Sequence, residues 1–275
     1  MEPYQGNPVR LFFLAILKGT MTRILNVSDV HVDTVTAGFV RFDDISETLW
    51  KTVHKAIDER FDYYLFTGDF CDPDGGGDSF GYARLAIRLA TRLADAGIKS
   101  IWMAGNHDVV ESGNGYTTLS PLRAVSESKH YRGLIEVFEE PGIMSLEKRL
   151  GDIPSAGFLA LPFTSHDRNY DPAKALIELV PPDLTPGKIP IIVAGHLNIE
   201  GIEIGSETTD FPRGRDVFFP QQACDDLVKA GHSLIKVNGH YHKQQVFEGI
   251  HIPGSVANLT FGEEDYRPGY QVIEV

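Results

Sequence analysis

Cysteine is scarce in this sequence, which has only Cys71 and Cys224 among its 275 residues. Two cysteines cannot build a disulfide framework, and their spacing is not that of a zinc finger, so we expect free thiols in a reducing compartment. The cytoplasm fits that expectation best. Long hydrophobic runs are also missing, since residues 11–17 are apolar but too short to span a bilayer, and no small-residue cleavage site follows them. The sequence therefore predicts no membrane contact.

Positive charge is in short supply as well. The chain has 25 Lys and Arg against 38 Asp and Glu, a net charge of -13, which argues against a large electrostatic surface for nucleic acid. A phosphate ligand is still compatible with this balance, because bound metal cations can supply a local positive field. The length fits one large domain, which we place at residues 22–275. Residues 1–21 are interpreted as an N-terminal extension that need not belong to the fold.

Short apolar runs alternate with amphipathic segments in the first half of the chain. Strands are predicted at residues 23–27, 63–67 and 100–103, and helices at about residues 45–60 and 82–96. This β-α-β-α-β order predicts an α/β fold with a parallel or mixed sheet. Further strands are predicted at residues 158–162, 189–194 and 234–238, with short strands of a sheet edge toward the C-terminus. Between residues 109 and 152 the pattern is weak.

Five of these apolar runs end in a turn that carries metal-binding or proton-transferring side chains. The five polar turns are Asp29-x-His31, Gly68-Asp69-x-x-Asp72, Gly105-Asn106-His107-Asp108, Gly195-His196 and Gly239-His240-x-His242. Residues two apart in an extended segment point to the same side, so each Asp/His or His/His pair can hold one ion. Sites in α/β sheets lie at the carboxyl ends of strands, so we expect the five polar turns to converge. One such motif is weak evidence, but five in order are strong evidence for a site.

This order of motifs closely resembles that of the calcineurin-like metallophosphoesterases, over residues 23–275. The resemblance implies a two-sheet β-sandwich flanked by helices and a centre of two divalent metal ions. It assigns Asp29, His31 and His242 to one metal, Asn106, His196 and His240 to the other, and Asp69 to a bridging position. The mixed nitrogen and oxygen donors suit manganese, iron or zinc, of which we expect manganese.

The resemblance also implies a reaction. Two metal ions activate a water for attack on phosphorus and neutralise the phosphoryl oxygens. His107 is then expected to protonate the leaving oxygen as the general acid. Asp72 is the predicted partner that fixes the tautomer of His107, and Asp108 is a competing candidate for that role.

Within this superfamily the sequence most resembles the SbcD/Mre11-type DNA nuclease subunits. The supporting stretches are residues 68–72 with the helix that follows, residues 159–163, and residues 253–256 with 259–261. The resemblance implies a nuclease that acts on DNA, an SMC-like ATPase partner and the option of a homodimer. The regions of those nucleases that cap DNA and dock the ATPase have no recognisable counterpart, which together with the charge of -13 counts against duplex DNA binding.

Two alternatives remain open at this point. One is a phosphatase or phosphodiesterase for small nucleotides or phosphoproteins. It would use the same metal chemistry but have different residues around the opening of its substrate pocket. The other is a non-catalytic, metal-bound scaffold, against which the complete ligand set and the presence of His107 argue. Basic residues that could touch a nucleic-acid backbone are scattered and are interpreted as solvated surface. They are Arg123, Lys129, Arg132, Arg168, Arg213 and Arg215.

Overall fold

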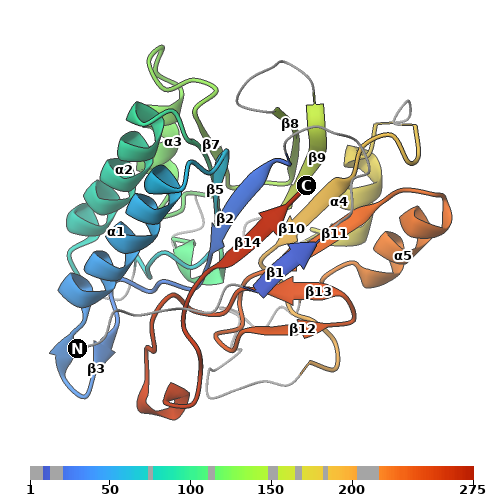
Figure 1. The fold of residues 1–275 in the computed structure, drawn as a ribbon. Coiled ribbons are helices and arrows are strands. Elements are labelled where there is room, and N and C mark those ends of the chain that lie inside the picture. The colour runs from blue at the N-terminus through green and yellow to red at the C-terminus, as the bar shows by residue number, and fades with distance from the viewer. Residues whose placement is uncertain are drawn as a thin grey trace.

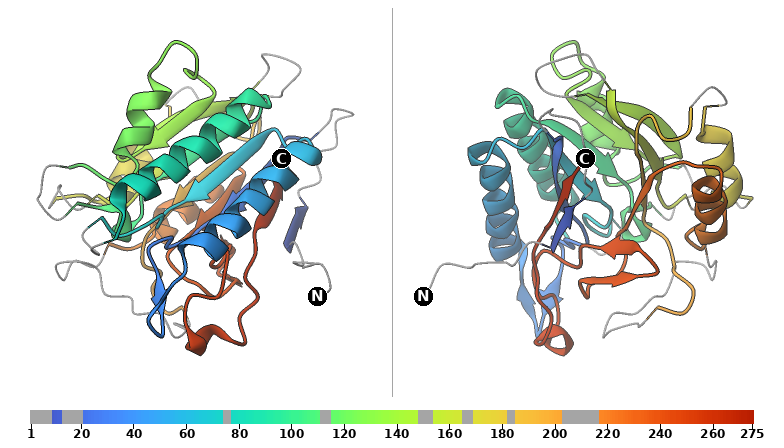
Figure 2. Two further views of the ribbon diagram at one scale, coloured as in Figure 1. Left: turned by 90° about the vertical axis from the view of Figure 1, so that its left-hand side faces the viewer. Right: turned by 45° about the vertical axis from the view of Figure 1, so that its right-hand side comes forward.

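The computed structural model places two β-sheets face to face, with helices on both outer sides (Figure 1, Figure 2). It describes residues 9–12, 21–73, 77–110, 115–147, 154–164, 169–181, 185–202 and 217–275. Within these described ranges each sheet has six strands, and a separate short hairpin pairs two more. The predicted α/β class, a two-sheet sandwich flanked by helices, is confirmed.

The first sheet has a parallel centre built from the β-α-β-α-β segment. Its strands β2 (Arg23–Val27), β5 (Tyr63–Thr67) and β6 (Lys99–Met103) are parallel neighbours, and α1 (Phe42–Asp58) and α2 (Ser79–Asp95) connect them. On one side α3 (Ser120–Ser126) and the parallel strand β7 (Ile135–Phe138) follow; on the other, β14 (Gln271–Glu274) runs antiparallel to β2. The three helices α1 to α3 lie on the outer face of this sheet (Figure 1).

The second sheet is built from the C-terminal half of the chain. Its strands, in spatial order, are β12 (Gln245–Phe247), β13 (Ile250–Ile252), β11 (Leu234–Asn238), β10 (Ile191–Gly195), β9 (Pro154–Leu161) and β8 (Gly142–Glu147). The helices α4 (Pro172–Leu179) and α5 (Gln221–Lys229) pack on its outer face. Like the first sheet, it has parallel strands at its centre, because β9, β10 and β11 all run the same way.

Three hydrophobic layers hold these elements together. The middle layer lies between the sheets, where Tyr63 and Ile101 from the first sheet join Phe158, Ile192 and Val237 from the second. The other two layers lie between each sheet and its helices. Strands buried on both faces need side chains that are apolar throughout, which is why β5 and β10 appear in the sequence as continuous apolar runs.

The structure differs from the sequence prediction in the weakly patterned stretch and at the C-terminus. Residues 109–152 contain α3, β7 and β8, none of which was predicted. The C-terminal strands were expected at a sheet edge, and β12 does lie there, but β14 pairs inside the first sheet between β1 and β2. The helix α1 begins at Phe42, so Asp43 and Asp44 lie in its first turn instead of capping it.

The strand β1 (Val9–Phe12) lies within the segment interpreted as an N-terminal extension. Its backbone pairs in parallel with β14 at the edge of the first sheet. Residues 1–8 and 13–20 of the same segment lie outside the described residues. The start of the domain at residue 22, after an extension of residues 1–21, stays a prediction. Among the described residues, no helix combines the length and the apolar character needed to cross a membrane.

Candidate metal centre

The five polar turns meet at one end of the sandwich. They follow β2, β5, β6, β10 and β11, whose carboxyl ends lie along the facing edges of the two sheets. Two groups of ligand atoms form there, and within each group the atoms lie within 4.8 Å of one another. The first group is Asp29, His31 and His242, and the second is Asp69, His196 and His240.

Asp69 and Asn106 connect these groups. Oδ2 of Asp69 lies 3.5 Å from His31 Nε2 and 3.2 Å from His196 Nε2, so one carboxylate faces both groups. Oδ1 of Asn106 lies 3.1 Å from His196 Nε2 and 3.0 Å from His240 Nδ1, which places the amide oxygen within the second group. All seven predicted ligand residues are therefore gathered in one cluster.

Four of the five polar turns contain a glycine, and these glycines allow the close approach. A Cβ on Gly68, whose φ is +101°, would lie 2.1 Å from His196 Nδ1. A Cβ on Gly105 would lie 2.2 Å from Asp69 Oδ1, and one on Gly239 would lie 2.3 Å from the Thr67 carbonyl oxygen. Any larger residue at these positions would push the turns apart. The recurring strand-glycine-ligand pattern thus has a steric cause.

The backbone of several predicted ligand residues is held in the left-handed region. The φ angles are +50° for Asp29, +44° for His31, +61° for Asp69 and +79° for His240. Asp and His tolerate this region better than most residues, yet each still costs free energy that the surrounding fold must offset. Such outliers gather where a fold holds side chains in place for a ligand.

The first group has the electrostatic character of a cation site. Asp29 is fully buried, and its two carboxylate oxygens accept no hydrogen bond of ordinary geometry from the described residues. Burial raises its pKa to about 6, and the nearby His196 and His242 only partly offset that effect. Burial likewise lowers the pKa of His31 well below its usual range. Asp69 Oδ2 lies 3.5 Å from His31 Nε2, which has no hydrogen bond of ordinary geometry among the described residues. A divalent cation fits these buried, uncompensated donor atoms.

The two histidines of the second group differ in their protonation, and only His240 is neutral before an ion binds. His196 Nδ1 lies 2.6 Å from the Thr67 carbonyl, to which it can donate, so that Nε2 points to Asp69 and Asn106. Burial lowers the pKa of His196, but the carboxylates of Asp69 and Asp29 and the Thr67 carbonyl together outweigh burial and raise this pKa to about 9. Burial, followed by the charge of His196, lowers the pKa of His240 to about 3, which keeps its ring neutral. Metal binding requires neutral imidazoles, so an ion must displace the proton of His196.

Asp108 fixes the geometry of two turns. Its buried carboxylate accepts backbone hydrogen bonds from Gly105 at 2.8 Å, from Asp69 and Phe70 at 2.9 Å, and from Cys71 at 3.3 Å. The Thr118 hydroxyl donates a further bond at 2.5 Å. Both oxygens are thus engaged, and the turn carrying Asp69 is tied to the turn carrying Asn106.

His107 lies beside the two groups but belongs to neither. Its ring is half-buried, with its centroid 5.0 Å from that of His31, and its backbone N–H donates to Asp69 Oδ1 at 2.9 Å. Asp72 is half-buried in the loop after β5. Asp33, which the sequence did not suggest, lies near both: burial raises its pKa, the charge of Asp72 adds to that, and His107 opposes it.

Glu263 is the other site residue that the sequence did not reveal. It is fully buried in a 3-10 turn (Phe261–Glu263), with Oε1 2.9 Å from His242 Nδ1. Its Oε2 accepts from the Leu259 backbone N–H at 2.6 Å. A carboxylate behind a metal-binding histidine fixes the ring and its tautomer, leaving Nε2 for the metal. The residue is 21 positions from His242, so no local spacing signals it.

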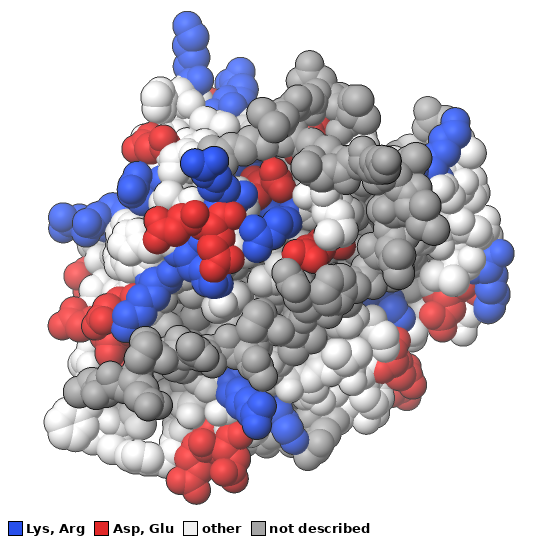
Figure 3. All heavy atoms as spheres, viewed as in Figure 1, with Lys and Arg blue, Asp and Glu red and all other residues white. Residues whose placement is uncertain are grey.

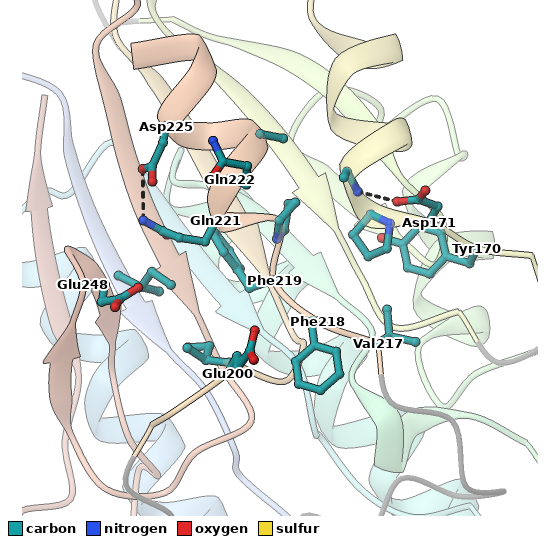
Figure 4. A pocket seen from close by; sticks show the side chains of 16 residues that line it. Tyr170, Asp171, Glu200, Val217, Phe218, Phe219, Gln221, Gln222, Asp225 and Glu248 are labelled. Carbon is teal, nitrogen blue, oxygen red and sulfur yellow. Dashed lines mark hydrogen bonds between the residues drawn. The ribbon is translucent and has the colours of Figure 1, made fainter. Parts of the chain in front are cut away.

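A separate cavity of about 760 Å³ lies beside the second sheet, between the beginnings of α4 and α5 (Figure 4). Glu200 and Glu248 line it together with Phe218 and Tyr170. None of the predicted site residues lines it, so the metal centre and this cavity are distinct. The two cysteines are free, as predicted, and both are buried.

Comparisons with known proteins agree with this geometry. The model of the calcineurin-like phosphoesterase family matches residues 22–244, which include all five polar turns. The DNA double-strand break repair protein Mre11 of Sulfurisphaera tokodaii is 30% identical over 149 residues, which cover 54% of this chain and 35% of Mre11. The match therefore spans about a third of that relative's length.

A solved structure shares the fold at much lower identity. A dimetal phosphatase from Danio rerio superposes with a TM-score of 0.50 and 11% identity, covering 86% of this chain and 88% of the phosphatase. The region matched by the family model covers most of the sequence and includes every residue of the two ligand groups. This chain therefore belongs to the calcineurin-like phosphoesterase family.

Proposed function

We propose that this chain is a dinuclear metal-dependent phosphodiesterase that cleaves nucleic acid. Family membership supports phosphoester hydrolysis, and the similarity to a DNA double-strand break repair protein is the observation that carries the choice of substrate. The repair protein is matched over only part of its length, so its substrate is extended to this chain as a proposal. The cluster of seven ligand residues supports the chemistry.

The proposed ligand set follows the two groups of donor atoms. Asp29, His31 and His242 hold one ion, and Asn106, His196 and His240 hold the other. Asp69, which faces both groups, bridges them. The bound ions, with manganese as the proposed metal, supply an activated water and positive charge for the phosphoryl oxygens.

His107 acts as general acid in this proposal. It is half-buried beside the ligands, so its ring can reach both the site and solvent. Its backbone is fixed by the hydrogen bond to Asp69, which keeps the imidazole at one place relative to the ligands. Because both oxygens of Asp108 are engaged elsewhere, Asp72 is the proposed partner that orients the His107 ring, and Asp33 is a rival.

The test is cleavage of a labelled DNA strand by the manganese-loaded protein, followed on a denaturing gel. His107→Gln should lower the rate about 10²- to 10⁴-fold, the usual contribution of a general acid. His130→Gln, which changes an exposed histidine away from the site, is the matched control. Hydrolysis of a phosphomonoester such as p-nitrophenyl phosphate with intact DNA would contradict the nuclease proposal.

A phosphatase or phosphodiesterase acting on small nucleotides or phosphoproteins is the second candidate. The net charge of -13 favours it, and basic side chains are interspersed with acidic ones over the face shown in Figure 3. Of the scattered basic residues, Arg168, Arg213 and Arg215 lie outside the described residues.

The proposed reaction requires neither the ATPase partner nor the homodimer that the sequence resemblance implies.

A further inference from the structure

A short hairpin projects from the sandwich directly after the first polar turn. Its strands β3 (Val35–Thr36) and β4 (Phe39–Val40) are antiparallel, and the two residues between them have φ angles of +50° at Ala37 and +83° at Gly38. Two consecutive positive φ angles are typical of a type I′ turn, the tight connection that matches the twist of a hairpin. The hairpin is therefore a defined element of structure.

Hydrogen bonds tie the hairpin to the segment that supports the metal centre. The Thr36 hydroxyl donates to the Leu259 carbonyl at 2.6 Å, and Arg41 Nη1 donates to the Asn258 carbonyl at 3.2 Å. Leu259 in turn donates to Glu263, whose other oxygen lies against His242. The hairpin and the turn containing Phe261 lie next to each other (Figure 2). A continuous chain of contacts thus runs from the hairpin to a predicted ligand.

Two exposed aromatic side chains belong to these connected segments, one on the hairpin and one in the turn beside it. Thr36 and Phe39 are directly paired, so their side chains lie on one face, and the Thr36 contact turns that face toward residues 258–261. Phe39 is 74% exposed and Phe261 is 76% exposed. Val35 and Val40 lie on the opposite face of the hairpin. We call Phe39 and Phe261 the aromatic rim.

We propose that the aromatic rim stacks bases of a single-stranded stretch of the substrate on the way to the metal centre. This inference rests on the proposed nuclease function and names how the substrate is held. The scissile phosphate must lie at the ligand groups, so a polymeric substrate has to continue over the adjoining surface. Exposed aromatic faces stack on any base and favour unpaired strands, whose bases are accessible.

The charge of the chain limits which kind of contact could hold such a strand. A net charge of -13 makes binding through the phosphate backbone weak, so a strand needs another source of affinity. Stacking supplies affinity without positive charge. Large apolar side chains exposed on connected segments can form a binding surface. Its continuity with the metal centre favours the substrate over a partner that binds elsewhere.

The experiment measures cleavage of a single-stranded oligothymidylate by the manganese-loaded full chain. Phe39→Ala and Phe261→Ala should each raise KM about 5- to 150-fold, from ~1–3 kcal/mol per stacked base at 1.4 kcal/mol per tenfold, with little change in kcat. Both side chains are exposed, so the variants should fold. Val40→Ala, which removes a 68% exposed side chain from the opposite face of the same hairpin, should leave KM unchanged.

Two further probes make the result specific. With an abasic strand of the same length, wild type and both Phe variants should have equal KM, because nothing is left to stack. With methyl p-nitrophenyl phosphate, all of them should have equal kcat/KM, because this diester carries no base. The ratio of KM between variant and wild type should also hold as salt is raised, since stacking involves no counterion release.

The outcomes separate the inference from the function on which it rests. Cleavage of oligothymidylate with the same KM in wild type and both Phe variants overturns the stacking role and leaves the nuclease proposal standing. Hydrolysis of the small diester without any cleavage of the oligonucleotide overturns both. If the Phe variants instead dissociate a dimer seen by size-exclusion chromatography and KM is unchanged, the rim binds a second copy and the inference is wrong.

Discussion

Replacement of Glu263 by glutamine tests whether a residue far from the ligand motifs sets the affinity of the metal centre. The carboxylate serves two donors, the Leu259 backbone N–H and His242 Nδ1. Glutamine has nearly the same volume but only one acceptor oxygen. If that oxygen stays with Leu259, its amide N–H₂ faces His242 Nδ1 and favours the tautomer with the proton on Nε2. That tautomer cannot bind a metal through Nε2.

The magnitude follows from the burial of this contact. Glu263 is fully buried, so water cannot replace the lost acceptor. Removing such a supporting carboxylate typically weakens metal affinity about 10- to 100-fold, or about 1.4–2.7 kcal/mol. The cost to folding should be of similar size, ~1–3 kcal/mol, because one buried donor is left without its partner.

Calorimetric titration of manganese into the metal-free protein measures this effect directly, and urea unfolding measures the cost to stability. Glu264→Gln is the matched control, since it changes the same residue type one position later at an exposed site. A change in manganese affinity below about twofold in a Glu263→Gln protein of unaltered circular dichroism would refute the orienting role, because the mechanism requires the His242 tautomer to respond.

Other consequences of the site can be tested on the same protein. Asp108→Asn should cost ~2–3 kcal/mol in urea unfolding, because an amide N–H₂ would face backbone donors that the carboxylate now accepts. Gly105→Ala should abolish manganese binding in calorimetry, because the added Cβ would clash with Asp69. Gly157→Ala is the control and should bind manganese normally, because its added Cβ would make an ordinary contact at 3.8 Å. Manganese at 100 times its Kd should add ~2.7 kcal/mol of stability and raise Tm accordingly; an unchanged Tm would contradict a preformed site.

The candidate site was largely predictable because each of its motifs is local. A strand, a glycine and a ligand in succession can be recognised within a few residues, and parallel strands bring such turns to one edge. His196 and Asn106 could therefore be expected to meet although 90 residues separate them. The same reasoning located the strands β5 and β11 at their observed bounds.

The residues that support the site were not predictable in the same way. Glu263 and Asp33 have no distinctive spacing, and they acquire their roles only where the folded chain buries them beside a histidine. The helix α3 and the strands β7 and β8 were missed because they are short and only partly buried, so their apolar residues show no clear period. The aromatic rim depends on which face of a two-residue strand pair turns toward Leu259, which only the register decides.

The arrangement of the two ligand groups implies that metal binding and folding are coupled. Asp29, His31, Asp69 and His240 adopt positive φ angles, and at about 1 kcal/mol each the strain amounts to about 4 kcal/mol. That is a large part of the ~5–15 kcal/mol by which a domain is stable, and the buried, unpaired Asp29 carboxylate adds to it. Asp29→Asn separates the two costs, because asparagine tolerates the same φ region and removes only the charge. We therefore expect Asp29→Asn to be more stable than wild type in the metal-free protein and less stable than wild type in the manganese-loaded protein. Urea unfolding of both forms measures this difference. Destabilisation of both forms would show that the carboxylate stabilises the fold and does not serve the ion.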